Sequence, residues 1–192
     1  MNIKITFLLI LALLSVSTSP IVAKALTGVG AISISFWRML FASMILWGYT
    51  VFKPQGRIKI PENRTKTIYA GILLGIHFAL FFQAIKITNI ANATFLGTLA
   101  PFFTLLVEIY FLKRVYDKKI ILGLLFIFIG AIIIFSYDLN IGSTYTLGNI
   151  YAILCSICLA AAFMIAEKVR KNEGTIVYTR TLYLSAAGTL LF

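Results

Sequence analysis

TIYAGILLGIHFALFFQAIKITNIANATFLGTLAPFFTLLVEIYFL, residues 67–112, is the stretch that decides the fold of this chain. Its only charged side chains are Lys86 and Glu108, and two apolar runs, 67–85 and 90–112, flank the segment around Lys86. Each run approaches or exceeds the roughly 20 residues that an α-helix needs to cross hydrocarbon. Because an α-helix satisfies its backbone polar groups within one segment, the stretch predicts two successive transmembrane helices.

The rest of the chain continues this pattern. Of its 192 residues 60% are hydrophobic and only 12% are charged, whereas a soluble domain of this size exposes far more charge. Further nearly uncharged runs are 5–23, 32–52, 120–137, 146–166 and 176–192. We therefore expect an all-α, polytopic transmembrane helical bundle with six complete spans and a partial seventh, which the chain end cuts at Phe192.

Basic residues are distributed unevenly between the predicted loops. The net charge is +11, which can indicate a nucleic-acid partner, but the cations alternate along the chain with the spans. The segments 1–4, 53–66, 113–119 and 167–175 hold 13 of the 17 Lys and Arg, whereas 24–31, 86–89 and 138–145 hold only Lys24 and Lys86. By the positive-inside rule the N-terminus is cytoplasmic, and the expected partner is the lipid bilayer, not nucleic acid.

Two features invite other interpretations. The first run resembles a signal peptide, with Lys4 before an apolar stretch, but it continues through Pro20 to Ala23 and further spans follow, so we expect a retained helix in a bacterial inner membrane. Cys155 and Cys158 share a helix face with no metal ligand near them in sequence, which favours packing over metal binding. We expect no catalytic constellation, metal or cofactor, so the chain is not predicted to be an enzyme.

An internal repeat relates the second and last runs. SISFWRMLFASMIL surrounds Arg38 and TIVYTRTLYLSAAG surrounds Arg180, at an offset of 142 residues. These arginines lie five predicted helices apart, and an odd number of spans turns the second copy upside down. Inverted repeats of this kind are a common plan of secondary transporters.

The chain from about Leu8 to Ile134 resembles one repeat of the EamA family of the drug/metabolite transporter superfamily. The resemblance is carried by FWRMLFA around Arg38, by HFALFFQAIKITNIANATFLGTLAPFFTLL from His77, and by Gly123 and Gly130. It implies ten helices in two inverted halves. Residues 5–137 would be the first five-helix repeat and 146–192 the incomplete start of the second. This favours a fragment or truncated chain, with a degenerate copy as the alternative. Arg114 stands where the family often has a Glu.

A transporter needs polar side chains near the bilayer midplane, and a few residues supply them. Arg38 lies about seven residues into its span and predicts attraction of an anionic substrate, with snorkelling as the alternative. Ser19 belongs to a polar patch in the first helix. His77, near the middle of its span, is a candidate for proton coupling or for an interhelical hydrogen bond, and Gln83 follows on the same helix.

The run 90–112 contributes the remaining candidates. Asn92 and Thr98 lie in its polar first half, and Pro101 removes one backbone hydrogen bond and predicts a kink. Together these residues predict a secondary transporter, or its N-terminal portion, that moves a small organic metabolite or drug by alternating access. The alternatives are a non-transporting membrane partner subunit or a lipid-modifying membrane enzyme; the substrate and the oligomeric state stay open.

Overall fold

The computed structural model describes residues 3–137 and 144–191, which form eight helices and no strand. The helices are α1 (Ile3–Ala25), α2 (Ala31–Phe52), α3 (Pro61–Ile87), α4 (Ile90–Gly97), α5 (Ala100–Tyr110), α6 (Lys118–Tyr137), α7 (Thr144–Val169) and α8 (Thr175–Thr189). Most of the predicted outer segment 138–145, and the last residue of the seventh run, lie outside the described residues. The predicted all-α class is confirmed.

The helices match the predicted spans. Five helical segments of the described chain are long and apolar enough to cross a membrane: Ile5–Ala25, Ala31–Phe52, Pro61–Ile87, Ile90–Tyr110 and Thr144–Val169. The 20 residues of α6 cover the sixth run, and the 15 residues of α8 cover part of the seventh. The structure is thus that of a polytopic helical membrane protein.

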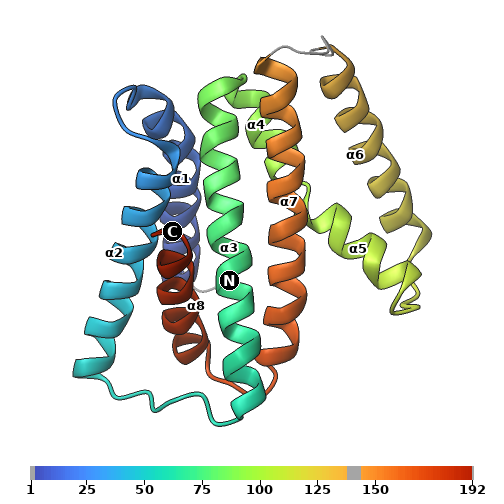
Figure 1. Cartoon of the computed structure of the whole chain (residues 1–192). Coiled ribbons are helices and arrows are strands. Elements are labelled where there is room, and N and C mark those ends of the chain that lie inside the picture. The colour runs from blue at the N-terminus through green and yellow to red at the C-terminus, as the bar shows by residue number, and fades with distance from the viewer. Residues whose placement is uncertain (1–2, 138–143, 192) are drawn as a thin grey trace.

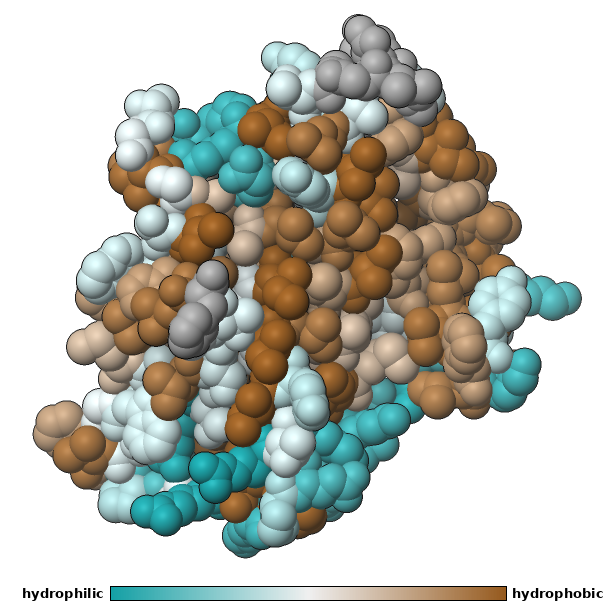
Figure 2. Space-filling model, viewed as in Figure 1, coloured by the Kyte–Doolittle hydropathy of each residue, from teal (hydrophilic) through white to brown (hydrophobic). Residues whose placement is uncertain are grey.

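Helix α3 occupies the centre of the bundle. It packs against α1, α2, α4, α7 and α8, whereas α6 lies at one edge against α4 and α5 (Figure 1). Most large apolar side chains of α1 and α6 are exposed. Figure 2 shows apolar surface across the middle of the visible face and hydrophilic surface toward its ends, as expected for a protein whose middle contacts lipid.

The start of α3 corrects one boundary. The sequence predicted a loop over 53–66, but α3 begins at Pro61, six residues before the predicted run. Proline costs no hydrogen bond in the first turn of a helix, and its fixed φ suits that position. Pro61 therefore starts a helix here instead of continuing a turn.

The predicted span 90–112 is divided into two helices. Thr98 and Leu99 lie between the end of α4 and the start of α5, and Pro101 lies in the first turn of α5. The Thr98 hydroxyl donates to the carbonyl of Phe95 at 2.9 Å. Because Pro101 has no N–H and its ring clashes with the preceding turn, the helix is interrupted where the sequence predicted only a kink.

Glycines allow α3 to approach α8 closely. A Cβ at Gly75 would lie 2.9 Å from the carbonyl oxygen of Ala186 and 3.1 Å from Thr189 Cβ, and one at Gly71 would overlap Ser185. Gly71 and Gly75 are four residues apart, so both face α8. This small-xxx-small spacing is typical of tightly packed membrane helices.

Candidate substrate pathway

Arg38 lies inside the bundle between three helices. Arg38 belongs to α2, and its guanidinium donates a hydrogen bond to the hydroxyl of Ser19 on α1. The same group contacts two aromatic rings of α3. Its guanidinium carbon is 5.0 Å from the ring centroid of Phe78 and 5.7 Å from that of Phe82. Ser19 is its only hydrogen-bond partner among the described residues, although a guanidinium has five N–H donors. The half-buried group retains donors for an anion.

His77 lies next to this cluster on α3. Its ring is stacked on Phe81 and makes an edge contact with Phe78, the ring that Arg38 also contacts. Nδ1 lies 2.8 Å from the carbonyl oxygen of Cys155 on α7. Because a carbonyl only accepts, Nδ1 is the donor, and His77 is 6% exposed. This is the interhelical hydrogen bond that the sequence offered as the alternative to proton coupling.

The other candidates lie along α3, α4 and α5. Gln83 is half-buried on α3, and Asn92 is half-buried on α4. Thr98 and Pro101 are exposed at the interruption between α4 and α5, both of which pack against α7. The structure therefore joins Ser19 to Arg38 and, through the ring of Phe78, brings Arg38 close to His77.

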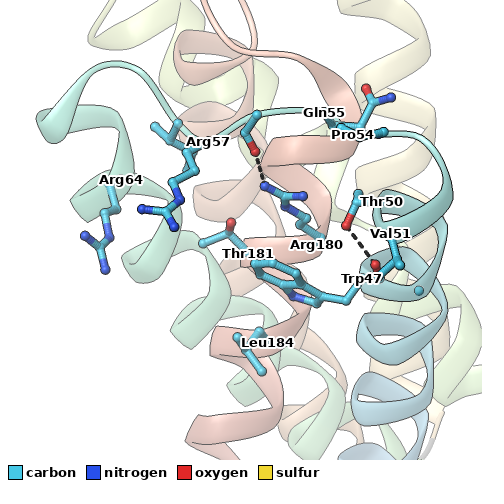
Figure 3. Close-up of a pocket in the computed structure, with 13 residues that line it drawn as sticks. Trp47, Thr50, Val51, Pro54, Gln55, Arg57, Arg64, Arg180, Thr181 and Leu184 are labelled. Carbon is cyan, nitrogen blue, oxygen red and sulfur yellow. Dashed lines mark hydrogen bonds between the residues drawn. The ribbon is translucent and has the colours of Figure 1, made fainter.

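Arg180 occupies a second polar site, at the end of α8 that faces the α2–α3 loop (Figure 3). It is 5% exposed and donates to the carbonyl of Gly56, and its guanidinium carbon lies 4.3 Å from the ring centroid of Trp47. A cavity of about 820 Å³ opens beside it. Arg57 and Arg64 also line this cavity.

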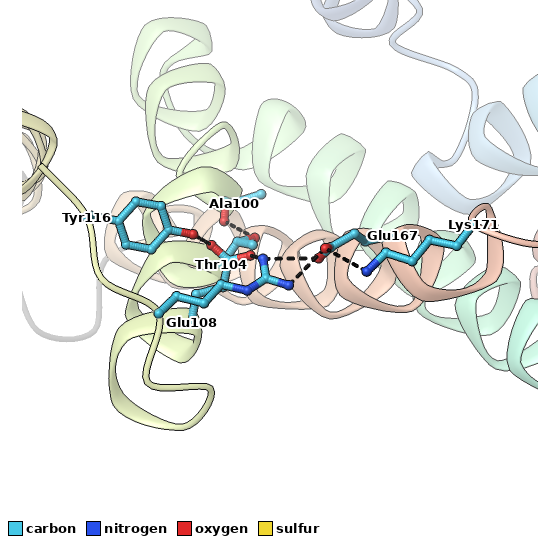
Figure 4. Close-up of polar contacts among 7 residues, drawn as sticks. Ala100, Thr104, Glu108, Tyr116, Glu167 and Lys171 are labelled. Carbon is cyan, nitrogen blue, oxygen red and sulfur yellow. Dashed lines mark hydrogen bonds and ion pairs between the residues drawn. The ribbon is translucent and has the colours of Figure 1, made fainter.

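Glu108 belongs to a network of charges that joins α5 to α7 (Figure 4). Its carboxylate pairs with Arg114 at 2.5 Å and accepts the Tyr116 hydroxyl, and Arg114 also pairs with Glu167 at 2.9 Å. Lys171 lies 3.7 Å from Glu167. The hydrogen bond to Glu167 raises the pKa of Arg114, and the hydrogen bond to Glu108 raises the pKa of Tyr116. Arg114 thus links α5 to α7 through Glu108 and Glu167.

Both ends of α3 are capped by charged side chains from elsewhere in the chain. The Glu173 carboxylate, in the α7–α8 connection, accepts from the backbone N–H of Lys59 and Ile60 and from the Asn63 amide, at 3.1–3.2 Å. At the other end, Lys24 Nζ donates to the carbonyls of residues 85, 86 and 88, at 2.8–3.1 Å. Each charge complements the helix dipole at the end it caps.

The sequence interpretation missed three of these features. The spacing of Gly71 and Gly75 was a usable signal for the α3–α8 contact. Arg180, within a span and close to loops rich in Arg, was recognised only as the repeat of Arg38. Glu173 gave no signal, because its partners at 59–63 lie more than a hundred residues away.

Comparison with known proteins identifies the family. The model of the EamA-like transporter family matches residues 3–136, more than half of the chain. This chain belongs to the EamA-like transporter family. The EamA-like chain is also similar to pseudopaline exporters of two Pseudomonas aeruginosa strains, UCBPP-PA14 and ATCC 15692, each 23% identical over 176 residues. That alignment covers 90% of this chain and 59% of each exporter.

The EamA-like chain therefore spans about three-fifths of the length of the curated relatives that it matches. No solved structure matches it. The family is one of membrane transporters, which agrees with the transporter class that the sequence predicted.

Proposed function

We propose that this chain forms part of a secondary transporter that moves a small organic anion out of the cell by alternating access. Arg38 is the observation that carries the proposal. A guanidinium inside a membrane bundle is costly unless it is paired. Within residues 3–137 and 144–191, Arg38 contacts one hydroxyl and two aromatic rings but forms no ion pair with a carboxylate. A carboxylate on the substrate would supply the missing counter-charge and use the remaining donors.

Two further observations support transport and its direction. Helices α2 and α8 pack side by side and run in opposite directions, with Arg38 and Arg180 at comparable distances from their starts (Figure 1). This arrangement supports an inverted repeat, with residues 5–137 as its first half. The similarity to pseudopaline exporters favours export over import.

We place the chain in a bacterial inner membrane with the N-terminus in the cytoplasm. This placement is supported by the uneven distribution of basic residues: the segments assigned to the cytoplasm hold 13 Lys and Arg, whereas the segments assigned to the outside hold two. The lipid bilayer and a small-molecule substrate are then the partners.

The proposal is tested by substrate binding to the purified chain in lipid nanodiscs, with pseudopaline and simple amino-carboxylate metabolites as probes. We expect saturable binding that Arg38→Ala weakens about tenfold or more, because a charge-assisted hydrogen bond inside a dry site is lost. Arg38→Lys retains the charge and should bind with intermediate affinity. Ser33→Ala, an exposed position on α2, serves as the control.

Transport is measured separately in everted vesicles that carry the chain or a longer form of it. We expect Arg38→Ala and His77→Ala to lower accumulation of the bound metabolite without reducing the amount of protein in the membrane. Unchanged binding and accumulation in Arg38→Ala would remove this residue from the substrate site. Absence of binding by every probe would contradict an organic-anion substrate of this class.

A further inference from the structure

The cavity beside Arg180 concentrates positive charge. Arg57, Arg64 and Arg180 line it, and no acidic residue is among the lining residues. Arg57 and Arg64 are exposed, whereas Arg180 is 5% exposed. A buried cation is costly unless an opposite charge or a full set of acceptors compensates it. The lining provides no such charge.

Arg180 itself is held in place with donors unused. One terminal nitrogen donates to the carbonyl of Gly56, and the guanidinium carbon lies 4.3 Å from the ring centroid of Trp47, which is a cation–π contact. Nε is buried and has no hydrogen-bond partner. Neither a neutral carbonyl nor a ring neutralises the charge, and no acidic side chain pairs with Arg180 in the part of the chain that the structure describes. The side chain is therefore preorganised to bind an anion.

The loop that forms one wall is shaped for this contact. Gly56 has a φ of 74°, in the left-handed region that glycine adopts without strain. Its carbonyl is the acceptor for Arg180, so the turn fixes the loop against α8. In Figure 3, Arg57 follows directly on this turn and lies between Arg64 and Arg180.

The position of the cavity points to the ligand. It lies where α2 ends and α8 begins, at the end of the bundle where the basic loops gather. Anionic lipid headgroups accumulate at basic clusters beside membrane spans, and Trp is common at that depth. The planar fork of Arg matches two oxygens of a phosphate. We propose that this cavity binds a phosphate-type oxyanion, from a lipid headgroup or a soluble phosphate ester.

Fluorescence of Trp47 offers a direct test, because this ring touches the guanidinium that would bind the anion. The sequence has one other tryptophan, Trp37, which is exposed, and Trp37→Phe leaves Trp47 as the only reporter. The 192-residue chain in a mild uncharged detergent is titrated with inorganic phosphate, with short-chain phosphatidylglycerol and with short-chain phosphatidylcholine. Sodium chloride at matched ionic strength controls for screening.

We expect a saturable change in Trp47 fluorescence with phosphatidylglycerol, with phosphate, or with both, and none with chloride. Saturation by both indicates that the phosphate group suffices, and saturation by phosphatidylglycerol alone identifies a lipid site. Arg180→Gln should weaken the response about tenfold or more. Because that variant also loses the Gly56 and Trp47 contacts, Arg57→Gln and Arg64→Gln are measured too, and each should weaken it severalfold.

Lys168→Met is the matched control, because it removes one exposed cation that does not line the cavity. It should leave the response unchanged. A response to chloride equal to that to phosphate, or no saturation with any probe, would overturn the proposal. Equal weakening by Lys168→Met and by the Arg variants would do the same, since the effect would then be one of net charge. None of these results depends on Arg38 or on transport.

Discussion

At the scale of single residues, the contacts of each charged side chain within a span indicate what that side chain can do. Arg38 and Arg180 occupy related positions in α2 and α8, but their contacts differ. The Arg38 guanidinium contacts one side-chain hydroxyl and two aromatic rings, whereas the Arg180 guanidinium contacts one backbone carbonyl and one aromatic ring. Neither has a carboxylate among the described residues. The two arginines therefore differ in surroundings, while each guanidinium makes one hydrogen bond among the described residues.

Glu173 permits a pH prediction at this scale. Burial opposes its ionisation, but the hydrogen bonds from Asn63, Ile60 and Lys59 outweigh it and lower the pKa below its ordinary value. A lowered pKa stabilises the fold above the ordinary Glu pKa of about 4.3, and this contribution is lost as the pH falls through the lowered value. We expect Glu173→Gln to lower the melting temperature at pH 7, and the gap from the parent chain to close in acid.

The measurement is thermal unfolding in detergent, followed by circular dichroism at several pH values. Glu62→Gln is the control, because it removes a carboxylate from the first turn of α3 whose ion pair with Lys66 is exposed. Exposed pairs contribute little, so this variant should resemble the parent chain. A gap for Glu173→Gln that stayed constant with pH would show that its charge does not cap α3.

At the scale of elements, close contact between α3 and α8 depends on two glycines. Because lipid is as apolar as a side chain, membrane helices gain stability from close packing and not from burial alone. Gly75→Val would press two methyl groups against α8. Ala186 and Thr189 already lie 2.9 Å and 3.1 Å from the place that a Cβ at position 75 would occupy. We expect a loss of about 1–3 kcal/mol in stability, as for other overpacked sites.

Unfolding in detergent mixtures measures this loss. Gly123→Val on α6 is the matched control, since nothing lies within 4 Å of a Cβ built there. It should change stability by less than about 0.5 kcal/mol. Equal losses in the two variants would mean that helix propensity, and not the α3–α8 contact, is responsible.

At the scale of the whole molecule, three basic segments, 53–66, 113–119 and 167–175, gather at one end. The bond between Lys59 and Glu173 joins the α2–α3 loop to the α7–α8 connection, and the pair between Arg114 and Glu167 brings the α5–α6 loop to the end of α7. At the opposite end, Lys24 and Lys86 both donate to backbone carbonyls. Both of these lysines thus satisfy backbone carbonyls at or beyond helix ends.

Orientation is tested by labelling single cysteines with a membrane-impermeant maleimide. We expect Arg57→Cys to react in everted vesicles and Thr27→Cys to react in intact spheroplasts, because the positive end faces the cytoplasm. The parent chain, whose Cys155 and Cys158 lie within α7, provides the background. The reverse pattern would invert the assigned topology.

Hydropathy by itself determined the all-α class and the approximate spans, because crossing lipid requires long local runs whose backbone is satisfied internally. The start of α3 at Pro61 and the break between α4 and α5 appeared only in the structure. The alternation of basic segments likewise predicted which loops share an end. Only the tertiary structure decided the partners of Arg38, Arg180 and Glu173, since each acts on residues 19 to 124 positions away. Side-chain pairing across such separations depends on helix rotation and depth, which local composition does not encode.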